Sequence, residues 1–354
     1  MGYRTQRHCN LALLCNEIYI EAINWILKDP PMPEGAHDLA PLDPAKFQDP
    51  FTTAAGAVRA AVALSALRTV WFNTGSLCNI TCENCYMDSS PKNDDLVYLS
   101  HDHAKAYLDE IKTAHLPVQE IGFTGGEPFM NNDLCAMLDD VLDHGLDALV
   151  LTNAMRPLWQ KRGQLQALQN RHGVDRVAAK LKLRVSIDHF TETLHEKERG
   201  QNTWTPMEQG VKWLGENGFT IDVAGRTLWD ENAEQSRKGY QQLFDAWSLA
   251  IDAHDPAHLV LFPEMDATRD VPEITTQCWS LLNVRPDAMM CATSRMVVHR
   301  KGADAPSVAP CTLLPYDTAF DMGARLTDAD GAVQLNHPHC ARFCVLGGAS
   351  CSVT

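Results

Sequence analysis

Three closely spaced cysteines are the residues of this 354-residue chain best suited to chemistry. Cys78, Cys82 and Cys85 form the pattern Cys-x3-Cys-x2-Cys in the segment SLCNITCENCYM. Three thiolates on a short loop can bind three irons of a [4Fe–4S] cube and leave the fourth iron open to a small molecule. A partial zinc site and free loop thiols are the alternatives, but a zinc site would need a fourth ligand, and none is evident in this loop.

A second motif, Gly125-Gly126-Glu127-Pro128, directly follows a predicted strand. Because glycine lacks a Cβ atom, the two glycines would let the backbone approach a ligand closely. The carboxylate of Glu127 can accept hydrogen bonds from an ammonium group. Taken alone, however, these four residues indicate a plain turn rather than a binding site.

Cysteines also gather near the C-terminus, where six of the twelve lie between residues 278 and 351. Because the sequence shows no secretion signal, metal ligation is a stronger interpretation than disulfide bonds. Two fully ligated [4Fe–4S] clusters would need about eight thiolates, so six cysteines favour one additional cluster. A structural zinc site with the same ligands is the alternative. The predicted ligands are Cys291, Cys311, Cys340 and Cys344, with Cys351 as a competitor for one place.

Strands that alternate with helices must position these residues. Strands are predicted over residues 69–73, 120–124, 148–152, 183–188, 220–227 and 258–262. Helices are predicted over residues 101–114, 133–144, 205–217 and 232–249, with Ser100 and Asn132 as N-caps of the first two. This alternation predicts an α/β fold with a parallel sheet, arranged as an open or partial (β/α)6 TIM-like barrel. Active sites of such folds lie at the carboxyl ends of the strands.

The chain divides into three predicted parts. Residues 1–69 are expected to form a helical extension, with helices over 11–28 and 53–67 joined by a proline-rich linker. Residues 70–270 are expected to form the partial barrel. Residues 271–354 are expected to form a small, separate, cysteine-rich α+β domain, with short β segments over 295–300 and 307–309.

Charge and hydropathy exclude some partners. The chain has 30 Lys and Arg against 45 Asp and Glu, a net charge of −15. Because phosphate backbones bind clustered cations, nucleic acid is not expected as the main partner. No apolar run approaches the roughly 18 residues of a membrane span. The apolar N-terminal stretch is interrupted by charged residues and does not fit a signal peptide, so we expect a cytoplasmic enzyme.

Taken together, the ordered motifs resemble those of the radical S-adenosylmethionine (radical SAM) superfamily. The third predicted strand ends in Thr152-Asn153-Ala154, and the fourth ends in Ser186-Ile187-Asp188. His195 and then Arg199-Gly200 follow, as in the branch that includes anaerobic sulfatase-maturating enzymes and peptide maturases. The resemblance covers about residues 70–265.

This resemblance implies a role for each residue of the set. Cys78, Cys82 and Cys85 would hold the cluster, whose open iron chelates the amino and carboxylate groups of SAM. The remaining cofactor-binding residues are then Tyr86, Gly125, Gly126, Glu127, Pro128, Asn153, Ser186, Asp188 and Arg226. Among them, the Gly-Gly-Glu-Pro segment would contact the methionine ammonium. Ser186, with Asp188 or Asn153, would bind the ribose, and Arg226 the carboxylate. Electron transfer to SAM would release a 5′-deoxyadenosyl radical that abstracts a substrate hydrogen atom.

Some residues depart from the family pattern or have a simpler interpretation. Relatives often carry an aromatic residue just before the third cysteine, where this chain has Asn84, and Ala154 replaces a usual glycine. Asp188 could instead cap a helix, and Arg226 could pair with a structural carboxylate. His195 and Arg199 are expected to order their loop.

The C-terminal cysteines resemble the auxiliary-cluster domains of the same superfamily, called twitch (one cluster) and SPASM (two clusters). The full SPASM pattern ends in C-x2-C-x5-C-x3-C, which this sequence does not match. An auxiliary cluster implies an oxidative outcome, either dehydrogenation or formation of a C–S, C–C or C–N bond. Cys135 and Cys278 are expected to be buried core residues, and His337 and His339 to have supporting roles.

Two kinds of substrate fit this resemblance. Peptide maturases of this branch often carry a winged-helix domain before the barrel, and residues 1–69 show no sign of its β-hairpin. We therefore expect a small-molecule substrate, with a peptide or protein side chain as the alternative, and a flavodoxin or ferredoxin as reductant. A non-enzymatic iron–sulfur or zinc protein is the third reading, but it gives the Gly-Gly-Glu-Pro motif no clear use.

Overall fold

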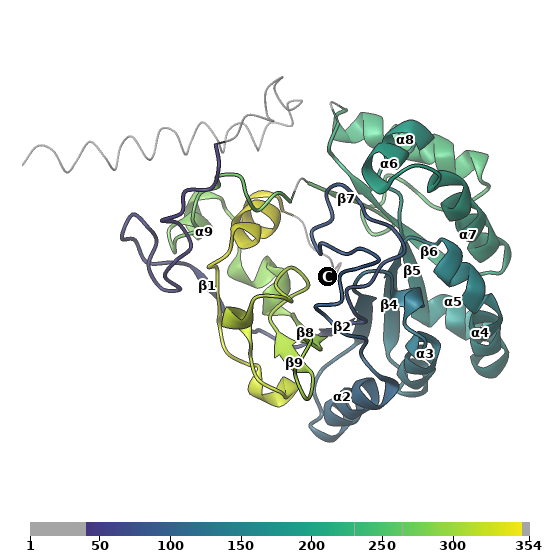
Figure 1. Cartoon of the computed structure of the whole chain (residues 1–354), viewed down its shortest axis with the longest axis horizontal. Helices are drawn as coiled ribbons and strands as arrows, with labels where there is room; N and C mark the ends of the chain where they lie inside the picture. Colours follow the sequence, from purple (N-terminus) through teal and green to yellow (C-terminus); the bar gives the residue numbers. More distant parts are fainter. Residues whose placement is uncertain (1–39, 230, 264, 349–354) are drawn as a thin grey trace, which may run out of the picture.

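An open eight-stranded sheet forms the centre of the computed structural model, which describes residues 40–229, 231–263 and 265–348 (Figure 1). The strand order is β7-β6-β5-β4-β3-β2-β8-β9. Neighbouring strands are parallel from β7 to β8, and β9 is antiparallel to β8. The strand bounds are β2 Thr69–Asn73, β3 Glu120–Thr124, β4 Asp147–Thr152, β5 Leu181–Ser186, β6 Thr220–Arg226, β7 Leu259–Phe262, β8 Ser294–Val298 and β9 Ser307–Ala309. The predicted α/β fold with a partial barrel is confirmed.

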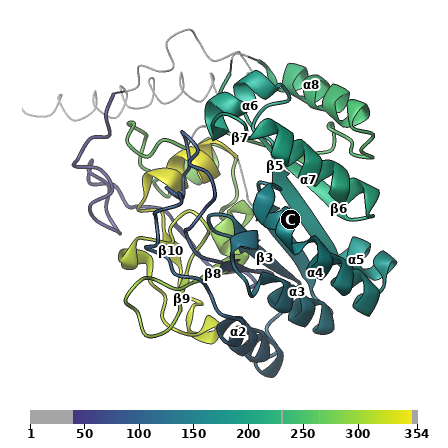
Figure 2. The ribbon, with the colours of Figure 1, turned by 45° about the vertical axis from the view of Figure 1, so that its right-hand side comes forward.

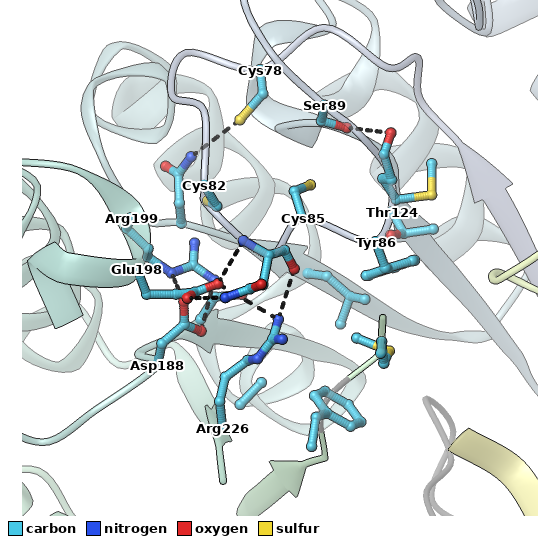
Figure 3. A pocket seen from close by; sticks show the side chains of 18 of the residues that line it. Cys78, Cys82, Cys85, Tyr86, Ser89, Thr124, Asp188, Glu198, Arg199 and Arg226 are labelled. Carbon is cyan, nitrogen blue, oxygen red and sulfur yellow. Dashed lines mark hydrogen bonds and ion pairs between the residues drawn. The ribbon is translucent and has the colours of Figure 1, made fainter. Parts of the chain in front are cut away.

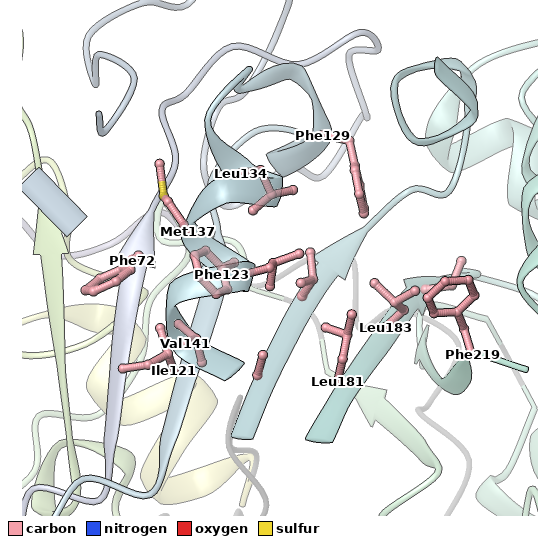
Figure 4. Close-up of a cluster of buried hydrophobic side chains, with 14 of the residues drawn as sticks. Phe72, Ile121, Phe123, Phe129, Leu134, Met137, Val141, Leu181, Leu183 and Phe219 are labelled. Carbon is pink, nitrogen blue, oxygen red and sulfur yellow. The ribbon is translucent and has the colours of Figure 1, made fainter. Parts of the chain in front are cut away.

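Helices follow the strands and cover one face of the sheet (Figure 2). Their bounds are α2 His101–Thr113, α3 Leu134–Asp143, α4 Arg156–His172, α5 Val174–Lys180, α6 Glu192–Arg199, α7 Trp204–Glu216 and α8 Ala233–Ala246. The apolar residues of α3 recur at helical spacing (Leu134, Met137, Leu138, Val141) and pack towards the central strands (Figure 4). Burial of this stripe fixes the helix on the sheet.

The N-cap residues of α2 and α3 test two predictions made from the sequence. Ser100 caps α2 as predicted, because its Oγ accepts a hydrogen bond from His103 N at 3.2 Å. The cap prediction for Asn132 is wrong, since Asp133 occupies the N-cap position of α3 and makes no side-chain cap bond there. The carboxylate of Asp133 instead accepts a hydrogen bond from His101 N at 3.1 Å, which ties the starts of α2 and α3 together.

The helix predicted over residues 53–67 is also wrong. This segment forms turns and the short strand β1 (Ala61–Val62), which pairs antiparallel with β10 (Val333–Gln334). The buried guanidinium of Arg59 pairs with Glu273 at 2.5 Å. Contacts with the last third of the chain therefore override the helix propensity of the alanines. The helix predicted over residues 11–28 lies outside the described residues.

The C-terminal third contributes directly to the main sheet. Strand β8 pairs with β2 in the register Thr69↔Ser294 to Phe72↔Val297, and β9 extends the sheet beyond it. A short helix α9 (Cys278–Leu281), β10 and a π-helical turn over Cys340–Leu346 complete this region. They share a second buried apolar cluster with residues of the 40–62 segment. No helix among the described residues is long and apolar enough to span a membrane.

Candidate active site

A cavity of about 140 Å³ opens at the carboxyl ends of the parallel strands (Figure 3). Cys78, Cys82 and Cys85 line it from the loop after β2. Each following strand adds residues at its end, as expected for this fold. Of the predicted cofactor-binding set, the cavity wall includes Tyr86, Gly125, Gly126, Asn153, Ser186, Asp188 and Arg226, while Glu127 and Pro128 lie buried behind it.

The two glycines after β3 pack against the loop that carries the cysteines. Gly126 N donates a hydrogen bond to Gly75 O at 2.8 Å, and Glu127 N donates to Leu77 O at 3.1 Å. A Cβ atom on Gly126 would collide with the backbone of Leu77, and one on Gly125 with the backbone of Gly75. The absence of side chains thus serves a close approach between two protein loops, in addition to exposing backbone to the cavity.

Glu127 joins the ends of β3 and β4 beneath the cavity. Its Oε1 accepts hydrogen bonds from Phe129 N at 3.1 Å and Thr152 Oγ1 at 2.8 Å. Its Oε2 accepts from Asn153 N at 2.8 Å. Burial raises the pKa of Glu127 to about 7, although these three hydrogen bonds act in the opposite direction. Through its hydrogen bond with Asn153 N, the Glu127 side chain positions Asn153, whose Nδ2 lies 3.9 Å from Cys78 Sγ.

The variant Glu127→Gln is expected to lower the free energy of unfolding by about 1–3 kcal/mol, because an amide in this place leaves a buried N–H without its acceptor. Urea unfolding of the protein would measure the change. Glu234→Gln on the exposed first turn of α8 is the control and should shift the value by less than about 0.5 kcal/mol. Equal stability of the two variants would show that the buried bonds of Glu127 do not hold the strand ends.

A second carboxylate, Glu198 at the end of α6, holds the cysteine loop from the other side (Figure 3). Its Oε1 accepts from Asn84 N at 3.1 Å and its Oε2 from Asn84 Nδ2 at 2.8 Å. Arg226 Nη1 donates to Asn84 O at 3.1 Å. Asn84, the residue that departs from the family pattern, is thus fixed by polar contacts just before Cys85. Glu198 was not among the site residues predicted from the sequence. The polar residue Asn84 was the signal that could have indicated a polar partner for the cysteine loop.

Asp188 lies in the cavity wall, but its carboxylate already has a strong partner. Arg199 donates to Asp188 Oδ2 through Nε at 2.7 Å and to Oδ1 through Nη2 at 3.0 Å. Arg199 also lines the cavity. Burial raises the pKa of Cys82 to about 11, and the positive charge of Arg199 works against that rise. Arg199 therefore places a cation where cysteine thiolates would form.

Arg226 and His195 differ in their exposure to the cavity. Arg226 lines it, is nine-tenths buried, and its Nε and Nη2 have no hydrogen-bond partner among the described residues. His195 is not part of the lining, and its ring packs edge-on against Trp204 at a centroid distance of 5.3 Å. Burial lowers the pKa of His195 to about 3, so the ring is neutral at pH 7. Arg226 Nη1 also lies 3.9 Å from Glu198 Oε1, so the arginine pairs with a structural carboxylate, while its Nε and Nη2 are suited to an anionic ligand.

A second cavity brings together the four predicted C-terminal ligands. Its wall includes Cys291, Cys311, Cys340 and Cys344. Strands β8 and β9 form a hairpin, and Cys291 and Cys311 lie just before and just after it in the chain. The π-helical turn presents Cys340 and Cys344. Cys351 lies outside the described residues.

The remaining predicted residues of this region lie elsewhere. Cys278 is buried at the start of α9, where its Sγ accepts a hydrogen bond from Thr275 N at 3.3 Å. It is not part of the cavity wall. The rings of His337 and His339 pack in a tilted arrangement at a centroid distance of 4.8 Å and do not line the cavity either. These placements agree with the structural roles expected for the three residues.

The four thiols of the second cavity are candidate metal ligands. The rest of the cavity wall is apolar, and burial raises the pKa of Cys291 to about 11 and of Cys340 to about 12. Such thiols ionise when a metal binds them. Within the described ranges, no three His, Cys, Asp or Glu side chains are grouped closely enough to hold one ion. Four thiols that line one cavity could supply the four protein ligands of a [4Fe–4S] cluster.

The two cavities share one wall. Leu313, two residues after Cys311, lines both of them. Phe262, Met265 and Phe343 lie on the same side of the first cavity. The rings of Phe262 and Phe343 pack with a centroid distance of 5.5 Å. Leu313 is thus common to two cavities, each lined by one group of cysteines.

The geometry agrees with comparisons to known proteins. Residues 72–234 match the family model of the radical SAM superfamily. One relative is an S-adenosylmethionine-dependent nucleotide dehydratase of Selenomonas ruminantium. The two chains are 33% identical over 76 residues, and this aligned region covers 22% of this chain and 26% of that protein. A second relative is the antilisterial bacteriocin subtilosin biosynthesis protein AlbA of Bacillus subtilis strain 168. The two chains are 24% identical over 196 residues, and this aligned region covers 54% of this chain and 41% of that protein. The matches thus span less than half the length of either relative.

Solved structures share the fold. Streptococcus suis SuiB bound to S-adenosylmethionine superposes with a TM-score of 0.50 and 11% identity, covering 73% of this chain and 64% of that one. The enzyme anSMEcpe with bound AdoMet gives a TM-score of 0.51 and 13% identity, covering 74% and 77%. A partial barrel with three cysteines after its first strand and a glycine-rich motif after its second agrees with this family match. Over residues 72–234, this chain therefore matches the radical SAM superfamily, the family that its ordered motifs resemble.

Proposed function

We propose that this enzyme generates a 5′-deoxyadenosyl radical at Cys78, Cys82 and Cys85, and completes an oxidative modification with an auxiliary [4Fe–4S] cluster. Cys291, Cys311, Cys340 and Cys344 would hold the auxiliary cluster. The observation that carries this proposal is the pair of thiol-lined cavities that share Leu313. The residue common to both cavities supports passage of an electron from a substrate radical in the first cavity to an acceptor in the second.

The first cavity offers separate groups for the parts of SAM. The two unpartnered nitrogens of Arg226 are available for its carboxylate. Asp188 is paired with Arg199, so the ribose hydroxyls would fall to Ser186 and Asn153. When bound, the reduced cluster supplies the electron that cleaves the sulfonium C–S bond. A flavodoxin or ferredoxin is the proposed electron donor.

The variant Arg226→Gln is expected to weaken SAM binding about 10- to 100-fold, because a charge-assisted hydrogen bond contributes about 1.5–3 kcal/mol. Calorimetric titration of the anaerobically loaded protein with SAM would measure the dissociation constant. Since Arg226 also binds the Asn84 carbonyl, iron content must be measured on the same sample. Unchanged affinity at full iron content would assign the SAM carboxylate to another group.

A small molecule remains the proposed substrate, and the match to a nucleotide dehydratase supports it. A peptide side chain is the second candidate, supported by the match to a bacteriocin biosynthesis protein. That match covers 54% of this chain, whereas the match to the nucleotide dehydratase covers 22%. An ultrafiltered extract of the source organism can distinguish the two. The small-molecule proposal expects the filtrate to stimulate 5′-deoxyadenosine formation, and the peptide proposal expects the retained fraction to do so.

Anaerobic reconstitution with iron and sulfide tests the two-cluster proposal. The wild type should bind about eight irons and form 5′-deoxyadenosine when dithionite and SAM are added. A variant with alanine at Cys291, Cys311, Cys340 and Cys344 should bind about four irons and still form it. Four irons in the wild type, with zinc bound at the C-terminal cysteines, would remove the auxiliary electron acceptor and favour a redox-neutral reaction.

A further inference from the structure

Arg295 on β8 is a fully buried cation beside the second group of cysteines. Its Nη1 donates to the backbone oxygens of Cys291 at 2.6 Å and Ser294 at 2.7 Å. Its Nε donates to Ala329 O at 2.7 Å and its Nη2 to Gly331 O at 3.1 Å. Every one of these acceptors is a neutral carbonyl, so the hydrogen bonds satisfy the guanidinium without balancing its charge.

Other buried arginines of the described chain have a carboxylate partner. Arg59 pairs with Glu273 at 2.5 Å, and Arg226 lies 3.9 Å from a carboxylate oxygen of Glu198. On the same hairpin as Arg295, Arg300 pairs with Asp321 at 2.6 Å. The ion pairs between described residues include none with Arg295. A buried charge without a close counter-charge is costly. The charge of Asp330 acts on Arg295, but the ion pairs between described residues include none between the two, so a further anion nearby would stabilise the guanidinium.

The thiols of the second cavity are in the right place to supply that anion. Burial lowers the pKa of Arg295, whereas ionised Cys291 and Cys311 would raise it again, together with Asp330. Both thiols line the cavity. Metal binding would deprotonate them, and a cluster held by four thiolates carries a net negative charge.

We propose that Arg295 is the fixed counter-charge of the auxiliary cluster and raises its reduction potential. The inference rests on the proposed function, because it requires a cluster at these cysteines. One-electron reduction makes a cluster more negative, and a buried cation nearby stabilises the more negative state. A higher potential favours transfer of one electron from the substrate radical to the cluster, so that the substrate is oxidised as the cluster is reduced.

A redox titration followed by electron paramagnetic resonance tests this role. The background is the full chain with Cys78, Cys82 and Cys85 replaced by alanine, because only the auxiliary cluster then contributes a signal. Arg295→Gln should shift the midpoint potential to a more negative value, and Arg295→Lys should stay close to the background. Arg300→Gln, which removes the same charge from the same hairpin, is the matched control and should leave the potential unchanged.

A second variant keeps Arg295 in place, in case its removal prevents folding. Gly331 is exposed, and a Cβ atom there would meet only Met322 Cε at 3.8 Å. Gly331→Asp would add a carboxylate to the residue whose backbone oxygen accepts a hydrogen bond from Arg295 Nη2, and should lower the potential, while Gly331→Asn should not. A purely structural Arg295 would change how much cluster binds without moving the potential of the clusters that form.

The outcomes separate this inference from the proposed function. Absence of iron in the background variant would overturn the auxiliary cluster itself, and the role of Arg295 with it. About four irons, with the potential unmoved in Arg295→Gln and Gly331→Asp, would overturn only the role of Arg295. A negative shift in Arg295→Gln that Arg295→Lys reverses would support it.

Discussion

Replacement of Cys78, Cys82 and Cys85 together by alanine is expected to abolish formation of 5′-deoxyadenosine from SAM. The three thiols line one cavity with the proposed SAM-binding groups, and thiolates are the ligands that hold such a cluster. The variant should therefore lose about four of about eight irons and all SAM cleavage, and keep the fold and the second cluster. Iron analysis and chromatography of the nucleoside product, after anaerobic reconstitution and addition of dithionite, measure both effects.

The matched control is Cys135→Ala. Cys135 is a buried thiol on α3 that lines neither cavity, so the variant should bind iron and cleave SAM like the wild type. Circular dichroism would confirm that the triple variant keeps its secondary structure. Formation of 5′-deoxyadenosine by the folded triple variant would refute the assignment of the cluster to these three cysteines.

The second large effect is expected for Gly126→Ala. The added Cβ would meet the backbone oxygen of Ser76 at 2.6 Å as well as the Leu77 carbonyl, and backbone cannot move aside as a flexible side chain can. The loop with Cys78 should be displaced, with loss of the Gly126–Gly75 and Glu127–Leu77 hydrogen bonds. We expect unfolding to require about 1–3 kcal/mol less and iron content to fall sharply.

A second glycine offers the control for this change. Gly163 lies in the exposed interior of α4 with nothing within 4 Å of a built Cβ, so Gly163→Ala should raise the free energy of unfolding by about 0.5–1 kcal/mol. Urea unfolding and iron analysis of both variants make the comparison. If Gly126→Ala bound iron and cleaved SAM like the wild type, the close approach of the two loops would not matter for the cluster.

The sheet could be predicted from sequence because its strands are short, apolar segments between helices with clear end signals. Strands over 69–73, 120–124 and 307–309 were predicted with the bounds that the structure shows. The active-site cavity followed from them, since polar residues at successive strand ends must meet at one edge of a parallel sheet. In each of these cases local pattern and tertiary structure agree.

Predictions failed where distant contacts decide the structure. The alanines of residues 53–67 favour a helix locally, but Ala60 exchanges backbone hydrogen bonds with Ile274 and Leu335. In the same way, nothing near Glu198 in the sequence indicates that its carboxylate would bind Asn84. Arg295 is a third example, because a single arginine in a predicted strand gives no sign that it will be buried without a carboxylate.

The pairing of β2 with β8 has a consequence for how the protein is made. β2 carries the loop with Cys78, Cys82 and Cys85, and its second neighbour in the sheet is synthesised only at residues 294–297. Until that part of the chain leaves the ribosome, β2 has an open edge, which is prone to pair with other chains. Contacts so distant in sequence also form slowly. Cys78, Cys82 and Cys85 are synthesised early during translation. The strand that carries their loop is completed on both edges only when the hairpin beside Cys291 and Cys311 has paired with β2.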